Sequence, residues 1–290
     1  MQIESVAAVR AQLGEGPLWD AERGLIWWVD IHGRMLHRHE VATGNNHAQA
    51  LECRLTALGL TPGHALIACG DRGFVRLGVA ADRSVHIREV IACPAEPAGN
   101  RFNDGKVDAH GRFWAGTMDD AERGAHGSLY RLDAGGGVHR IRSAIAVPNG
   151  PCFLADGTVL TTDSARRVIT ALQLDPAGEP IAERVFAHFG AAQGYPDGMC
   201  VDADDHVWVA FWDGWCLRRL SPAGEIVAEI GLPVQRPTCP VFGGADLRQL
   251  YVTTAATGLS RQALARQPLA GSLLRCEPGV RGRPPELFPD

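Results

Sequence analysis

Residues 103–118 read NDGKVDAHGRFWAGTM, and three other stretches of the chain repeat the same plan. A polar residue and a glycine lead into a short apolar piece, a turn rich in Asp, Ala and Gly follows, and a run of β-branched and aromatic residues closes the unit. Two such runs joined by a short polar turn predict a β-hairpin. The other copies are EGPLWDAERGLIWWVD (15–30), NGPCFLADGTVLTTD (149–163) and DGMCVDADDHVWVAFW (197–212).

The copies recur with a period of about 45 residues. They begin at residues 15, 103, 149 and 197, so the offsets are 88, 46 and 48, and 88 is two periods of 44. A weaker copy, RLTALGLTPGHALIACG (54–70), fills the gap, and a sixth, CPVFGGADLRQLYVTTA (239–255), follows the last. Six units of this length are typical of a β-propeller, in which each blade is a four-stranded antiparallel sheet. We therefore expect an all-β, six-bladed propeller that forms one domain over residues 1–290.

The segments outside the hairpins predict the remaining strands. ESVAAVRA (4–11) precedes the first full hairpin and is expected to supply the outer strand of the last blade, which would close the ring and remove exposed sheet edges. One helix is predicted in an insertion of the last blade, where Ser260 caps SRQALARQ and Pro268 ends it. The tryptophans of the hairpins are expected to pack between blades. His37 and His39 alternate in RMLHRHE and are expected on the solvent face of a strand.

Composition and charge exclude several classes of function. Lys and Arg number 28 against 33 Asp and Glu, a net charge of −5, so nucleic acid and membrane surfaces are not expected partners. The N-terminus lacks a signal-peptide pattern, and no eighteen apolar residues run together. The eight cysteines are scattered without C-x-x-C spacing, which favours free thiols in a reducing cytoplasm. We therefore expect a cytoplasmic protein.

The repeat also predicts a site, because one position of every blade lies at the same radius and height around the axis. Four of the six positions at one phase carry carboxylate or amide oxygens, a set that suits Ca²⁺, Mg²⁺ or Mn²⁺. Asn and Asp before Gly are also common turn formers, but Glu15 is not, and the shared phase favours a site. Alignment on Gly105 would select Asp104 in place of Asn103. Counting eight residues back from each hairpin turn gives Glu15, Leu55, Asn103, Asn149, Asp197 and Cys239.

Six motifs occur in order along almost the whole chain: LGEGPLW, RFNDGKVDAHGRFWAGTM, GSLYRLD, NGPCF, YPDGMCVDADDHVWVAFWDG and PVFGGADLRQLYVTTA. Together they closely resemble the gluconolactonase/regucalcin family, also called the senescence-marker-protein family, of six-bladed propellers. The segment GLSRQALARQPLAGSLL is similar to the bacterial branch that includes xylono- and arabinolactonases. The resemblance implies a metal-dependent hydrolase that opens aldono-1,4- or 1,5-lactones to the free aldonic acids.

The resemblance also implies which residues hold the metal ion. Its metal ligands carry over onto Glu15, Asn149 and Asp197. Asp197 is expected to act in addition as the general base that accepts a proton from the attacking water. One divalent ion is expected, with Ca²⁺ favoured and Zn²⁺, Mn²⁺, Mg²⁺ and Fe²⁺ left open.

Substrate contacts carry over in the same way onto Arg101 and Asn103. The family has an acidic side chain shortly after the G-T-M motif that touches the substrate, and here Asp120 is favoured, with Asp119 and Glu122 as alternatives. The particular lactone, its ring size and the oligomeric state are left open.

Two other functions are weighed against lactone hydrolysis. A related hydrolase on the same scaffold would act on organophosphates or aryl esters, because a fold alone does not define a function. A non-enzymatic propeller would bind a divalent cation or a protein, and its ring would need no base beside the metal. The chain has no H-E-x-x-H, G-x-S-x-G or G-x-x-x-x-G-K-[ST] segment, so zinc-helix, serine-elbow and P-loop chemistry have no support.

Overall fold

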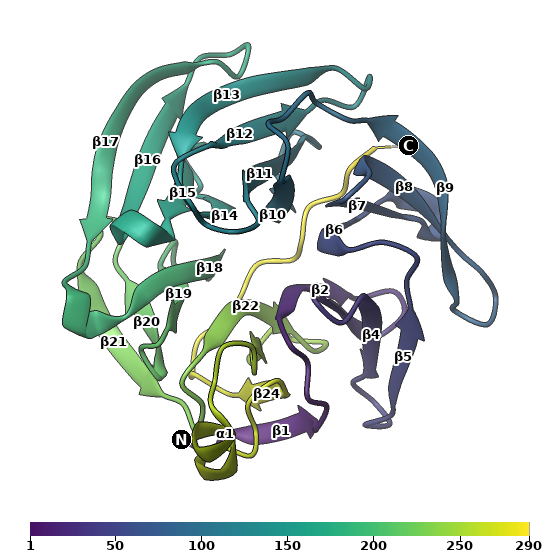
Figure 1. The fold of residues 1–290 in the computed structure, drawn as a ribbon, viewed down its shortest axis with the longest axis vertical. Coiled ribbons are helices and arrows are strands. Elements are labelled where there is room, and N and C mark those ends of the chain that lie inside the picture. The colour runs from purple at the N-terminus through teal and green to yellow at the C-terminus, as the bar shows by residue number, and fades with distance from the viewer. Residues whose placement is uncertain (290) are drawn as a thin grey trace.

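The computed structural model describes residues 1–289 and has six four-stranded antiparallel sheets arranged as blades around a central channel (Figure 1). The predicted six-bladed propeller is confirmed. In each blade the innermost strand lines the channel and the other strands follow outward. The strands of the six blades, from the innermost outward, are β2 (Gly14–Asp20), β3 (Leu25–Asp30), β4 (Met35–Glu40) and β5 (Asn46–Ala50); β6 (Leu55–Leu60), β7 (Leu66–Gly70), β8 (Gly73–Val79) and β9 (Val85–Ala92); β10 (Asn100–Val107), β11 (Phe113–Asp119), β12 (Gly127–Leu132) and β13 (Val138–Ile145); β14 (Pro148–Phe153), β15 (Val159–Asp163), β16 (Val168–Leu174) and β17 (Pro180–His188); β18 (Tyr195–Val201), β19 (Val207–Trp212), β20 (Cys216–Leu220) and β21 (Ile226–Gly231); and β22 (Pro237–Gly243), β23 (Gln249–Thr254), β24 (Leu273–Cys276) and β1 (Glu4–Ala7).

The ring closes as the sequence predicts, because β1 pairs antiparallel with β24 and becomes the outer strand of the sixth blade. The insertion between β23 and β24 contains the predicted helix, α1 (Arg261–Arg266), and the Ser260 hydroxyl accepts a hydrogen bond from the Ala263 backbone N–H at 3.1 Å. Short 3-10 turns cover η1 (Pro62–His64), η2 (Ser164–Arg166) and η3 (Ala191–Gln193). None of the helices within residues 1–289 is long and apolar enough to cross a membrane.

Three blades share an anchor in which a buried aspartate near the end of the inner strand binds a tryptophan of the second strand. The carboxylate accepts the indole N–H and also pairs with an arginine, so the apolar ring and the hairpin turn are held together. The predicted burial of the hairpin tryptophans is confirmed for Trp27, Trp28, Trp114 and Trp208. Trp212 is only partly buried. The anchors are Asp20 with Trp27 (3.1 Å) and Arg23, Asp108 with Trp114 (2.8 Å) and Arg112, and Asp202 with Trp208 (3.0 Å) and Arg219.

His37 and His39 are buried in β4, so the prediction that they face solvent is wrong. The His37 ring stacks on Trp28 with 4.0 Å between the ring centroids, and His39 lies near Tyr251 of the sixth blade. Alternation of side chains along a strand predicts solvent exposure of one face only where no neighbouring part of the fold packs on that face. Here both faces of the third strand lie inside the blade stack.

Every inner strand contains a shift in register near its start, which moves the chain relative to the second strand of its blade. Glu15 and Asn149 stand directly before the shift, whereas Asn103 and Asp197 lie within it. Residues that lie the same number of positions before the hairpin turn therefore do not occupy the same register position in every blade. The four oxygen-bearing members of the predicted ring therefore occupy two adjacent register positions, and Cys239 lies one position further along, because a bulge places an extra residue in the inner strand.

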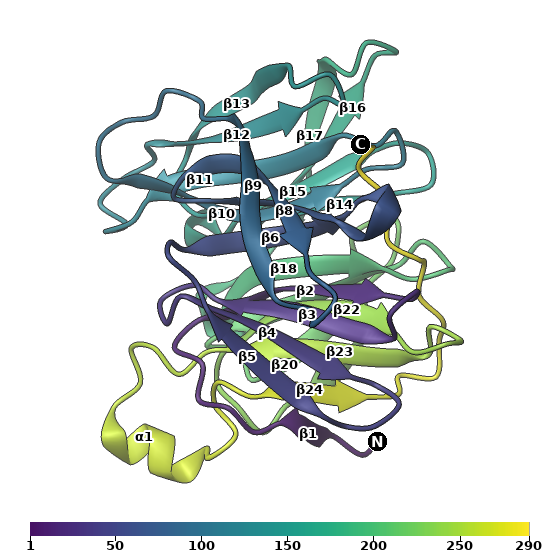
Figure 2. The same ribbon diagram turned by 90° about the vertical axis from the view of Figure 1, so that its right-hand side faces the viewer.

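The C-terminal tail, residues 281–289, crosses the channel at the end opposite α1 (Figures 1 and 2). Its backbone forms hydrogen bonds with three blades: Ala203 N–H donates to Arg281, Gly282 N–H donates to Leu247 and Phe288 N–H donates to Leu60. The end of the channel nearest α1 is called here the site end, and the other the tail end. The sequence offered no pattern that predicted this crossing.

Candidate functional site

The predicted site residues lie together around the site end of the channel, at the starts of the inner strands. Glu15 is on β2, Arg101 and Asn103 are on β10, Asn149 is on β14 and Asp197 is on β18, and all five side chains are buried. Leu55 and Cys239, the other two members of the predicted ring, are also buried but bring no oxygen. The oxygen-bearing side chains of the predicted ring therefore lie in four blades, and the remaining two blades contribute Leu55 and Cys239.

Amide hydrogen bonds join three neighbouring blades below this end of the channel. Asn103 Nδ2 donates to Asn149 Oδ1 and to the Pro148 carbonyl, each at 2.9 Å. Asn149 Nδ2 donates to Ser164 Oγ at 2.9 Å, and that hydroxyl donates to the Pro196 carbonyl at 2.6 Å. Asn149 Oδ1 thus accepts one of these hydrogen bonds and keeps a second lone pair for another partner.

Three buried carboxylates oppose one another in the same region. Burial raises the pKa of Glu15 well above its usual value, and the charges of Asp197 and Asp104 raise it further. Burial and the Asp104 charge likewise raise the pKa of Asp197. Burial raises the pKa of Asp104 to about 6, even though the Lys106 charge and the hydrogen bond from the Gly105 N–H lower it. Each of these three acids makes the charged forms of the others less stable. A bound cation would offset this repulsion.

Asp104 supplies a structural test of that cation site. Its Oδ1 accepts the Gly105 N–H at 2.7 Å, whereas its Oδ2 is buried and has no hydrogen-bond partner among residues 1–289. A buried carboxylate oxygen without a partner costs free energy unless something positive approaches it. Asp104, which the sequence offered only as an alternative to Asn103, is therefore part of the acidic group.

The donor chemistry fits a hard divalent ion, because the atoms available are carboxylate and amide oxygens. Among residues 1–289, no three His, Cys, Asp or Glu side chains converge closely enough to hold a metal by themselves. A cation at this place consequently needs the Asn149 amide oxygen together with Glu15 and Asp197. This group of three, with Asp104 beside it, is called here the oxygen cage.

The substrate-binding candidates form an ionic chain next to the oxygen cage. Arg101 donates from Nε to Asp120 Oδ1 at 2.6 Å and from Nη1 to Asn103 Oδ1 at 2.7 Å. Arg54 donates from Nη1 to the other Asp120 oxygen at 2.7 Å and from Nε to Asp71 at 2.9 Å. The sequence analysis did not identify Arg54. The one sequence feature that could have indicated it is its position directly before the inner strand of the second blade.

The three acidic candidates after the G-T-M motif differ in their surroundings. Asp119 is turned into its own loop, where it accepts from the Ala121 N–H and pairs with Arg123, and these bonds lower its pKa to about 2. Glu122 has φ of 53° and is exposed. Asp120 contacts Arg101 directly and has a pKa lowered by its two arginines, although partial burial opposes them. Of the three, Asp120 is the one hydrogen-bonded to a predicted site residue, whereas Glu122 acts on the site through its charge, which adds to the effect of burial in raising the pKa of Asp197.

The fold and the site together define a six-bladed propeller with an acidic, oxygen-lined cage at one end of its channel. Residues 13–256 match the family model described as the SMP-30/Gluconolactonase/LRE-like region. The chain is 35% identical to regucalcin of Gallus gallus over 99% of this chain and 98% of the relative. It is 32% identical to pentonolactonase XacC of Haloferax volcanii over 98% and 97% of the two chains.

A solved structure agrees with these sequence relationships. The crystal structure of a calcium-binding protein, regucalcin from Agrobacterium tumefaciens, superposes with a TM-score of 0.91 at 30% identity and covers 98% of this chain and 96% of that one. The chain therefore belongs to the SMP-30/gluconolactonase/regucalcin family, as the motifs predicted. The family includes lactonases and a calcium-binding regucalcin.

Proposed function

We propose that this protein hydrolyses a sugar-acid lactone, an aldono-1,4- or 1,5-lactone, to the free aldonic acid, with one divalent metal ion held in the oxygen cage. The observation that carries the proposal is the placement of buried carboxylates beside the polar pair Arg101 and Asn103 at the site end of the channel. The relatives add support, since one of them is a pentonolactonase. Ca²⁺ is the favoured ion because all the donors are oxygens.

Glu15, Asn149 and Asp197 are proposed to hold the ion, with Asp104 as a further negative charge beside it. A bound divalent ion supplies Lewis-acid polarisation of a carbonyl and stabilises the oxyanion that forms. The three ligands come from separate blades, so the propeller frame holds them in place before a substrate arrives.

Asp197 is proposed to take the proton from the attacking water. A carboxylate has two oxygens, so one can face the ion while the other accepts this proton. The water oxygen then forms a bond to the lactone carbonyl carbon, the bond from that carbon to the ring oxygen breaks, and the proton passes to the released alkoxide. The products are one carboxylic acid and one hydroxyl group on the same sugar chain.

Arg101 and Asn103 are proposed to orient the sugar hydroxyls. Arg101 still has donors not used by Asp120, Asn103 and the Phe102 carbonyl. Asp120 is the proposed acceptor for a substrate hydroxyl, since its side chain is 38% exposed. Binding of this kind positions the lactone carbonyl at the oxygen cage.

The first prediction concerns Asp197→Asn, which removes the proposed base and one charge of the cage. We expect acid release from a panel of aldonolactones to fall more than about 100-fold, because general-base catalysis contributes about 10²- to 10⁴-fold. Chelator should abolish the wild-type activity and added Ca²⁺ should restore it. Acid release is followed with a pH indicator, and circular dichroism checks the fold.

Asp246→Asn is the matched control, because Asp246 is an exposed acid in a hairpin turn. Undiminished lactone hydrolysis by Asp197→Asn would refute the assignment. Activity on aryl esters or organophosphates alone would favour the related hydrolase. Cation binding with no turnover of any substrate would favour a binding protein, a result for which the calcium-binding relative gives a precedent.

We also propose a cytoplasmic location. Its support is that all eight cysteines are free thiols, and most of them are buried. Fractionation of the native host cells tests it, and recovery of the protein outside the cytoplasm would contradict it.

A further inference from the structure

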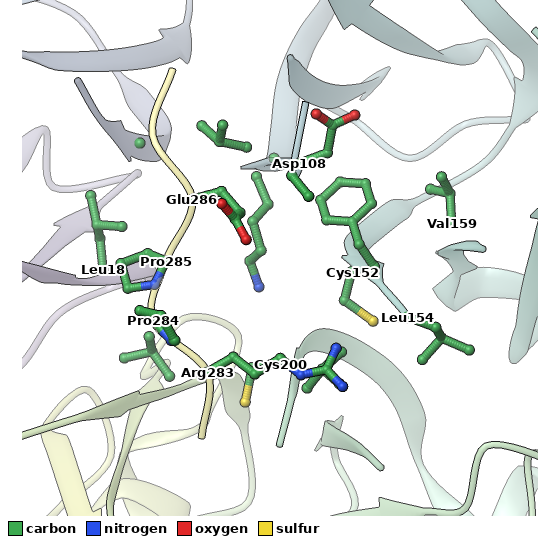
Figure 3. Close-up of a pocket in the computed structure, with 18 of the residues that line it drawn as sticks. Leu18, Asp108, Cys152, Leu154, Val159, Cys200, Arg283, Pro284, Pro285 and Glu286 are labelled. Atoms are coloured by element: carbon green, nitrogen blue, oxygen red, sulfur yellow. The ribbon is translucent and has the colours of Figure 1, made fainter. Parts of the chain in front are cut away.

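A cavity of about 510 Å³ lies inside the channel toward the tail end (Figure 3). Glu15, Asn149 and Asp197 do not line it, whereas Asp104 does, so it adjoins the oxygen cage at Asp104 and extends from there toward the tail. The tail residues 283–286 form one wall, and the hairpin turns at residues 108–110 and 155–157 form the rim. This space, called here the tail cavity, has the volume of a small-molecule site.

Most of the wall of the tail cavity is apolar and uncharged. Leu18, Phe153 and Val159 contribute hydrocarbon side chains. The thiols of Cys152 and Cys200 also line it, and burial raises the pKa of Cys152 to about 12 and that of Cys200 further. Both thiols are therefore neutral at physiological pH, and the body of a ligand here would meet apolar surface.

Lys106 brings a cation into this apolar space. Its side chain lines the tail cavity and keeps accessible surface although it lies deep in the channel. The ammonium donates one hydrogen bond, to the Met199 carbonyl, and within residues 1–289 no carboxylate lies within 4.0 Å of it. An ammonium has three donors, so two remain for a partner in the cavity.

The charge of Lys106 persists at neutral pH. Burial lowers its pKa, but the neighbouring Cys239 and Asp104 groups oppose this, and the net shift is upward. Asp104, on the same wall, offsets part of the cost of burying this cation, and an anion that enters the cavity and contacts the ammonium directly would offset more of it.

The other cations of the wall already have partners. Arg112 Nε pairs with Asp108 at 2.6 Å, and Arg283 Nη2 pairs with Asp205 at 2.8 Å. Glu286 on the tail turns its carboxylate toward the cavity (Figure 3) and is exposed. Lys106 is thus the one ammonium or guanidinium group on this wall, among the described residues, without a carboxylate partner.

We propose that the tail cavity binds a small monocarboxylate with an apolar body, whose carboxylate is held by Lys106 and whose hydrocarbon part packs on the wall formed by Leu18, Phe153 and Val159. Asp104 and Glu286, which both line the cavity, oppose this anion and limit its affinity.

The test measures binding of benzoate and octanoate by calorimetry, with benzyl alcohol and octanol as neutral probes of similar size. Wild-type protein treated with chelator is expected to bind each carboxylate at least about tenfold more tightly than the matching alcohol. Lys106→Met keeps the length of the side chain and removes the charge, so carboxylate affinity should fall about tenfold or more. Replacement of a buried charge by a hydrocarbon is often neutral for folding.

Glu286→Gln is the second variant, and it removes an exposed negative charge from the tail. It should tighten carboxylate binding about two- to fivefold because it removes a repulsion. Equal binding of alcohol and carboxylate, wild-type affinity in Lys106→Met, or unchanged or weaker affinity in Glu286→Gln would each overturn the proposal.

The same titration with Asp197→Asn separates this site from the proposed lactonase. Carboxylate binding should persist there, whether or not the protein hydrolyses lactones, since Asp197 does not line the tail cavity. A marked gain of carboxylate affinity in Asp197→Asn would place the anion at the oxygen cage, because that substitution removes a charge that repels an anion there, and it would overturn the tail-cavity assignment.

Discussion

At the scale of single residues, the oxygen cage concentrates negative charge where water is largely excluded. Glu15, Asp104 and Asp197 each have a raised pKa, with burial as the largest cause. For an acid whose pKa is higher in the folded state than in the unfolded chain, the folded state binds more protons between the two values. Its contribution to the free energy of unfolding therefore falls as the pH rises through that interval.

This argument gives a prediction for Asp104→Asn in protein treated with chelator. The ordinary pKa of Asp is 3.8 and that of folded Asp104 is about 6, so the destabilising charge develops between these values. The variant should melt at a higher temperature than wild type at pH 7.5 and at a similar temperature at pH 4. Thermal unfolding at both values measures it, and a lower melting temperature of the variant at pH 7.5 would contradict it.

At the scale of elements, each hairpin depends on polar anchors that are buried inside it. The Asp108 carboxylate accepts from the Trp114 indole, from Arg112 Nε and from the backbone N–H groups of His110 and Arg112. The turn and the two strands of this hairpin, β10 and β11 of the third blade, therefore share one acceptor group. Loss of that group would leave several donors without partners.

Asp108→Ala should lower the free energy of unfolding by about 2–4 kcal/mol, because buried donors lose their acceptor. Urea denaturation followed by tryptophan fluorescence measures the change. Glu52→Ala is the control: its side chain is 83% exposed, and the expected change is within about 0.5 kcal/mol. Equal effects of the two substitutions would show that the anchor contributes nothing to stability.

At the scale of the whole molecule, two segments far apart in the sequence complete the ring. The N-terminal β1 closes the sixth blade, and the tail crosses to the second and third blades, where Phe288 is buried with Ile67 of the second and Phe113 of the third. The tail end of the channel is thus covered by chain that belongs to no blade (Figure 2).

Phe288→Ala should lower the free energy of unfolding by about 3–5 kcal/mol, as truncation of a buried aromatic ring leaves a cavity. Leu287→Ala is the matched control, because the neighbouring Leu287 side chain is 48% exposed and should cost little. Chemical denaturation compares the two. A small effect of Phe288→Ala would mean that the tail is not a stabilising part of the propeller.

The amino-acid sequence by itself determined the propeller, the blade number, ring closure by the N-terminus and the helix after Ser260. These features depend on short-range patterns, alternation, turn residues and a helix cap, which repeat along the chain and are readable without tertiary contacts. The same repeat indicated Glu15, Asn149 and Asp197 as neighbours on the channel, and their roles as ligands stay a prediction.

Only the tertiary structure decided the register shifts of the inner strands, the inclusion of Asp104, the Arg54–Asp120 pair and the path of the tail. Each of these depends on contacts between segments far apart in sequence, such as Arg54 and Asp120 or Leu60 and Phe288. Burial of His37 and His39 has the same origin, because a neighbouring part of the fold covers a face that alternation alone predicts to be exposed. A local pattern specifies which elements form, whereas what they contact depends on the closed ring.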